Sequence, residues 1–253
     1  MRNIRMVEAI FVLLGLLGLT GVAHGRLETS ELDNIVANNE RVATRGQGTS
    51  AIKSLEIKLR MHDRGTLDAD YKVTRDGRMR IDILKDGKRV YTEAYDGRGG
   101  WDWVADGSAP TQDPHGAALW HGTQFPGGIF TLRDMAGLGH KLEYAGRERL
   151  DGIEYYVLKL TLSDGFVTYR YVNPTTWLID RGRDYRAFHP ALDRRETWVE
   201  TRWSEYRPVH GVLFSFASTN RDLRSGKILA TQEVTSIKVN PPIDPSVFVA
   251  PDR

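Results

Sequence analysis

The chain has 253 residues, carries a net charge of +2 at neutral pH and contains no cysteine. Charged residues make up 27% of it and are nearly balanced in sign, which gives no indication of a nucleic-acid partner. The lack of cysteine excludes disulfides, thiol catalysis, cysteine-based metal sites and an acyl-anchored lipoprotein.

Residues 1–25 have the composition of a secretory signal peptide. Arg2 and Arg5 precede the apolar run 9–20, and Ala23-His24-Gly25 offers small residues for cleavage. An uncleaved membrane anchor is the alternative, but the apolar run is shorter than the roughly 20 residues that span a bilayer. We therefore expect a soluble periplasmic protein in which residues 26–253 form a single domain.

The first predicted element of the mature chain is a helix over residues 30–45. Ser30-Glu31-Leu32-Asp33 resembles a capping box, and Gly46 is a plausible C-terminal stop. An apolar stripe at helical spacing follows the box and must be buried, most simply on a sheet. Its members are Leu32, Ile35, Val36, Val42 and Ala43.

The next fifty residues alternate between apolar and polar side chains, as half-buried strands do. Leu55, Ile57, Leu59 and Met61 alternate with charged residues in the first of these strands. Asp-Gly pairs then mark successive hairpin turns, which predicts an antiparallel meander. These pairs are Asp76-Gly77, Asp86-Gly87 and Asp96-Gly97.

Residues 105–128 break this rhythm and are rich in turn-forming proline and glycine. We expect a long loop here, followed by a short helix over residues 129–138 that Gly139 ends. A long loop with apolar residues is often a lid, although an ordinary segment covering one end of the sheet would look the same. The candidate lid residues are Leu119, Trp120, Phe125, Ile129 and Phe130.

Alternation resumes at Leu142 and continues to Val239, which brings the predicted total to about eleven strands. Many aromatic and other apolar residues fall on positions that look inward, and a curved sheet could use them to hold an apolar ligand. We predict that its walls include Met79, Ile81, Trp101, Trp103, Leu158, Tyr169, Trp177 and Phe214.

No catalytic or metal-binding pattern is recognisable. His115 and His121 are six residues apart, which does not put two ligands on one helical face. His62 and His140 are expected to be solvated at strand ends. The glycines at positions 97, 99 and 100 indicate a tight turn between strands, and the arginine-rich stretch 181–195 is explained by surface ion pairs. We expect no enzymatic activity, cofactor or metal.

Several segments, taken in order, resemble the LolA/LolB-like family of periplasmic lipoprotein carriers, in particular the outer membrane lipoprotein-sorting group. The segments are 51–55 (AIKSL), 78–82 (RMRID), 95–97 (YDG) with Trp101, 152–160 (GIEYYVLKL), 172–179 (VNPTTWLI) and 240–248 (NPPIDPSVF). The resemblance implies a mainly β (α+β) fold, in which a strongly curved antiparallel sheet forms a half-open barrel with an N-terminal helix and short lid helices. It also implies an arginine that bonds to the lid, with Arg80 as the nearest match and Arg78 possible.

The leading functional hypothesis is a periplasmic carrier or sensor of lipids or lipoprotein acyl chains. The alternative is a non-catalytic accessory or interaction protein of an envelope complex, which would have a membrane-protein partner. A hydrolase acting on envelope polymers is the third possibility, since carboxylates can meet across a sheet.

Overall fold

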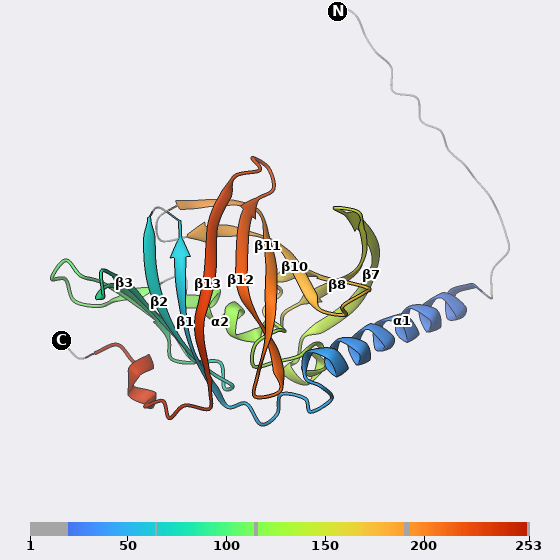
Figure 1. Ribbon diagram of the computed structural model, residues 1–253, viewed down its shortest axis with the longest axis horizontal. Helices are drawn as coiled ribbons and strands as arrows, with labels where there is room; N and C mark the ends of the chain where they lie inside the picture. Colours follow the sequence, from blue (N-terminus) through green and yellow to red (C-terminus); the bar gives the residue numbers. More distant parts are fainter. Residues whose placement is uncertain (1–19, 64, 114–115, 190–192, 252–253) are drawn as a thin grey trace, which may run out of the picture.

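The computed structural model describes residues 20–63, 65–113, 116–189 and 193–251 of the chain. In this part the protein is mostly β, as expected (Figure 1). The first strands are β1 (Ser54–His62), β2 (Thr66–Thr74), β3 (Met79–Lys85), β4 (Lys88–Tyr95), β5 (Gly100–Val104) and β6 (Thr111–Asp113). The later strands are β7 (Lys141–Leu150), β8 (Ile153–Thr161), β9 (Val167–Val172), β10 (Ile179–His189), β11 (Asp193–Val209), β12 (Val212–Asp222) and β13 (Ile228–Val239). The helices are α1 (Thr20–Ala43) and α2 (Gly116–Gln124), with 3-10 turns η1 (Leu132–Asp134), η2 (Ala136–Leu138) and η3 (Pro245–Phe248).

All thirteen of these strands form one antiparallel sheet, slightly more than the expected eleven. The additional strands include β6, which at three residues is too short to show an alternating pattern. Strands that follow one another in sequence pair in space, and the pairing of β1 with β13 joins the two halves. The sheet does not close, because β6 lies at one edge and β7 at the other.

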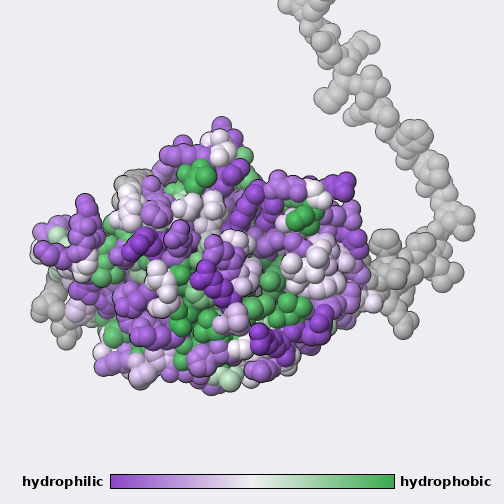
Figure 2. Space-filling view, viewed as in Figure 1, coloured by the Kyte–Doolittle hydropathy of each residue, from purple (hydrophilic) through white to green (hydrophobic). Residues whose placement is uncertain are grey.

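The sheet is strongly curved toward one face. Val73 on β2, Leu160 on β8 and Phe214 on β12 belong to one apolar cluster, although β2 and β8 are separated by six strands in the sheet. Such distant strands share a cluster only if the sheet bends around it. We call this side the concave face and the opposite side the outer face. In Figure 1 α2 lies behind β13 and β12, and Figure 2 shows the outer face in view as mostly hydrophilic.

Helix α1 packs on the concave face, as predicted. Ile35 is fully buried against Leu158 and Val172, and Asn39 donates a hydrogen bond to the carbonyl of Trp177 at 2.7 Å. The helix begins at Thr20 rather than at Ser30, so the residues that resemble a capping box lie inside it. The first nineteen residues of the expected signal peptide lie outside the described part of the chain. None of the helices in the described part is long and apolar enough to cross a membrane.

The predicted loop and helix between β6 and β7 are both corrected. Residues 116–124, expected to be loop, form α2, and the predicted helix over 129–138 is instead the two single turns η1 and η2. Two glycines explain the weak helical pattern of α2, whereas Gly137 and Gly139 break the later segment, with Gly139 at φ 78°.

Candidate functional site: the concave face and its lid

The connection between β6 and β7 must cross the open side of the half-barrel. These two strands are the opposite edges of the sheet, so the chain between them runs from one edge to the other. We call residues 116–140, which contain α2, η1 and η2, the lid segment. The lid that the sequence suggested therefore has the topology that a lid requires.

The apolar side chains of the lid segment are turned toward the sheet. Ile129 and Phe130 are 4% and 3% exposed in the concave cluster, and Trp120 and Phe125 pack against it. Leu119 is also buried. Exposing this surface would be unfavourable, so the lid segment is held closed by apolar contact in the absence of a ligand.

One arginine fastens the lid segment to the rest of the molecule, and it is Arg75. Its Nη1 donates hydrogen bonds to the carbonyls of Ile129 at 3.0 Å and Thr49 at 2.8 Å. Its Nη2 is 3.3 Å from the carboxylate of Asp134, and its guanidinium lies over the ring of Phe130. The sequence analysis missed this residue, whose only signal was its place directly before the Asp76-Gly77 turn.

Arg80, the expected lid contact, lies on the outer face. It forms a bidentate pair with Asp82 and donates to the carbonyl of Val247 in η3 at 2.8 Å. Arg78 likewise pairs with Asp76 and lies over Phe248. The assignment to Arg80 is therefore wrong. Strand alternation is the reason, because Met79 and Ile81 face the concave side and the residue between them cannot.

The eight predicted wall residues divide between the two faces. Met79, Ile81, Leu158 and Phe214 are on the concave side, and Trp177 joins the cluster under α1 from the turn before β10. Trp101, Trp103 and Tyr169 are on the outer face. The register explains this, because Trp101 pairs with Ala94, which lies beside Arg80, and Tyr169 pairs with Lys159.

Two histidines connect the lid segment to the turn between β8 and β9. His121 is 2.6 Å from the carboxylate of Asp164 and stacks on Phe166 at 4.2 Å. His140 is buried rather than solvated, which corrects the expectation. The amide of Ser163 donates to its Nδ1, which leaves the proton on Nε2, 3.2 Å from Gln124. Burial lowers the pKa of His140, which favours this neutral form.

Two glycines of α2 provide a matched test of lid docking. A Cβ on Gly116 would lie 2.7 Å from the Cα of Gly100 in β5, whereas one on Gly122 would lie 3.7 Å from the sulfur of Met79. We expect Gly116→Ala to cost about 1–3 kcal/mol of lid docking, because backbone must move. Gly122→Ala should instead stabilise α2 by up to about 1 kcal/mol, since alanine favours a helix. Hydrogen exchange of residues 116–124 measures both, and equal rates in the two variants would contradict the close contact.

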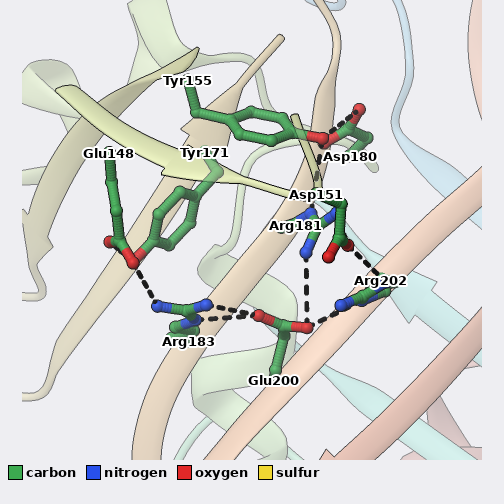
Figure 3. A network of polar contacts seen from close by, with 9 residues as sticks. All are labelled: Glu148, Asp151, Tyr155, Tyr171, Asp180, Arg181, Arg183, Glu200 and Arg202. Atoms are coloured by element: carbon green, nitrogen blue, oxygen red, sulfur yellow. Dashed lines mark hydrogen bonds and ion pairs between the residues drawn. The ribbon is translucent and has the colours of Figure 1, made fainter. Parts of the chain in front are cut away.

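The outer face carries an open groove with a volume of about 760 Å³ over β7–β11. Its aromatic wall includes Tyr169, Tyr185 and Trp198, of which Tyr185 and Trp198 are 51% and 44% exposed. Arg183 and Glu148, 2.9 Å apart, border the groove and belong to a larger polar network (Figure 3).

Glu200 is the centre of that network. Its carboxylate is 1% exposed and lies 2.7 Å from Arg202, 2.8 Å from Arg183 and 3.6 Å from Arg181 (Figure 3). Burial opposes ionisation of Glu200, but hydrogen bonds from Arg202 and Arg183 outweigh it and lower its pKa. A carboxylate held ionised in this way is a poor general acid, so the arrangement is structural. Within the described ranges, no three His, Asp or Glu side chains are placed to hold a metal ion.

No family model and no curated protein matches the chain in sequence. Solved structures match its fold. A LolA superfamily protein from Nitrosomonas europaea is 14% identical with a TM-score of 0.54, over 86% of this chain and 97% of the other. An outer membrane lipoprotein-sorting protein domain from Vibrio parahaemolyticus is 9% identical with a TM-score of 0.54, over 87% and 95%. At these identities the likeness shows the fold alone, which is the LolA-like fold that the sequence resemblance implied.

Proposed function

We propose that the protein is a periplasmic carrier or binding protein that holds the acyl chain of a lipid or lipoprotein on its concave face, beneath the lid segment. One observation carries the proposal: an edge-to-edge crossing segment buries Ile129 and Phe130 in the concave cluster. The LolA-like fold and the signal-like residues 1–25 support it.

The physical basis of binding would be an exchange of apolar contacts. An acyl chain that enters the concave face replaces the side chains of the lid segment, and each methylene it buries contributes about 0.8 kcal/mol. The displaced lid then competes with the ligand for the same surface. Uptake and release therefore depend on a small difference between two large and similar terms, as a carrier requires.

Mass spectrometry of organic extracts tests the proposal directly. Protein purified from the envelope fraction should contain acyl lipids in near-stoichiometric amounts, and a delipidated sample should bind a fluorescent acyl probe. Gly116→Ala should change the affinity for the probe, because it disturbs lid docking alone. Clean extracts together with the absence of probe binding would contradict the proposal.

That outcome would favour the second candidate, an interaction protein of an envelope complex. The specific observation in its favour is the outer groove, where Tyr185 and Trp198 expose aromatic surface beside Arg183. Exposed aromatic residues next to arginine are typical of protein interfaces. Cross-linking from position 198 would then capture a partner, and it should capture none if the groove is free.

A further inference from the structure

Arg170 is a charged side chain inside the concave face that no part of the lid mechanism uses. It lies on β9, where its register partners are Leu158 on β8 and Gly182 on β10, and it is 2% exposed. Its guanidinium lies between two rings, 4.2 Å from that of Phe125 and 5.3 Å from that of Trp203. Arginine is rarely buried to this degree unless it is paired.

The hydrogen-bonding capacity of this guanidinium is largely unused. Its Nε and Nη2 have no hydrogen-bond partner among the described residues. The acid whose charge acts on it most is Asp184, but that carboxylate accepts a hydrogen bond from Arg186 at 2.7 Å. Burial lowers the pKa of Arg170 to about 10, so it remains charged at neutral pH. Two buried, charged donors without acceptors are strongly unfavourable in a finished core.

The surroundings make room for this group. A Cβ on Gly182 would lie 2.4 Å from Nη1 of Arg170 and 2.8 Å from the ring of Trp203. Only glycine at position 182 therefore lets the guanidinium lie flat against the tryptophan.

The ring that covers the other side of Arg170 belongs to the lid segment. Phe125 also packs on the cluster that contains Ile129 and Phe130, so movement of the lid segment would withdraw it from the guanidinium. We propose that Arg170 binds the anionic head group, a carboxylate or a phosphate, of the amphiphile carried on the concave face. The inference rests on the proposed function and specifies the chemistry of its cargo.

In the loaded state the head group would take the place of Phe125 and accept hydrogen bonds from Nε and Nη2. These two donors lie on one edge of a guanidinium, which is the geometry that binds carboxylate and phosphate oxygens in pairs. The acyl tail would extend over Leu160 and Phe214 in the neighbouring apolar cluster. The cargo is thus an acidic amphiphile and not a neutral ester.

Calorimetric titrations of the full delipidated protein with palmitate, methyl palmitate, hexadecyl phosphate and inorganic phosphate test this. Wild type should bind the two acidic amphiphiles at least about 30-fold more tightly than methyl palmitate, the equivalent of two charge-assisted hydrogen bonds. Inorganic phosphate should bind far more weakly than hexadecyl phosphate, since the tail is needed; equal affinities would point to a free-phosphate site and overturn the inference.

Arg170→Met should abolish this preference while leaving the affinity for methyl palmitate within about 3-fold and the Tm unchanged or higher, since an apolar side chain replaces an unpaired charge. A purely structural arginine would lower Tm and weaken all ligands equally, which would overturn the inference. Gly182→Ala keeps the charge but displaces it, and should also lose the preference. If wild type binds palmitate and its methyl ester equally, the inference fails and the acyl site stands; if it binds neither, the proposed function fails as well.

Discussion

Replacing Glu200 by glutamine should lower the free energy of unfolding by about 3–5 kcal/mol, or the Tm by roughly 10 °C. The carboxylate is 1% exposed and contacts Arg181, Arg183 and Arg202, so its loss leaves positive charges facing one another in a buried place. The lowered pKa of Glu200 sets the sign of the pH dependence. Its contribution is present above the unfolded pKa, near 4.5, and is lost as pH falls through the folded value.

Glu196→Gln is the matched control for this prediction. Glu196 lies on the same strand and the same face as Glu200, but it is exposed beside the outer groove. We expect its replacement to change stability by no more than about 0.5 kcal/mol. Urea denaturation of both variants at pH 7 gives the comparison. Similar losses in the two would mean that the network contributes little and that net charge alone matters.

Replacing Arg75 by leucine should release the lid segment. The change removes hydrogen bonds to the carbonyls of Ile129 and Thr49 and the ion pair with Asp134. Bonds from a charged donor contribute about 1.5–3 kcal/mol, so exchange of amides in the lid segment should accelerate roughly 10- to 100-fold. Release of a bound acyl probe should become slower, because the closed empty state competes less well with the loaded state. Hydrogen exchange and stopped-flow fluorescence measure the two effects.

Arg78→Leu and Arg80→Leu serve as controls from the same part of the chain. Arg78 pairs with Asp76, and Arg80 with Asp82 and Val247, all on the side away from the lid segment. We expect Arg80→Leu to loosen η3 and to leave lid exchange and probe release unchanged. If either control accelerated lid exchange as much as Arg75→Leu does, the fastening role assigned to Arg75 would be refuted.

The candidate site could be predicted only in part. The sequence located the lid segment, because a run with prolines and apolar residues interrupts an otherwise regular alternation. It did not identify Arg75, since an arginine before a turn is ordinary and its partners Thr49, Ile129 and Asp134 are distant in the chain. The same limit applies to Arg170, whose burial depends on Phe125 and Trp203.

The error over Arg80 was avoidable from the sequence. Met79 and Ile81 were assigned to the cavity wall, and period-two alternation places the residue between them on the opposite face. Trp101, Trp103 and Tyr169 are a different case. Their alternation shows two faces, but both faces of these strands carry large side chains, so local pattern does not say which one is enclosed.

The sequence by itself determined the class of the fold, the meander of Asp-Gly hairpins and the position of the lid segment. These features depend on residues that are close in the chain: at Asp86-Gly87, for example, φ is 51° and 74°, as a two-residue hairpin turn requires. Only the tertiary structure decided which face is concave, which arginine holds the lid segment and which one is buried beneath it. The reason is that the direction of curvature is set where β2, β8 and β12 meet in one cluster, and contacts between residues so far apart in the chain leave no periodic signal in it.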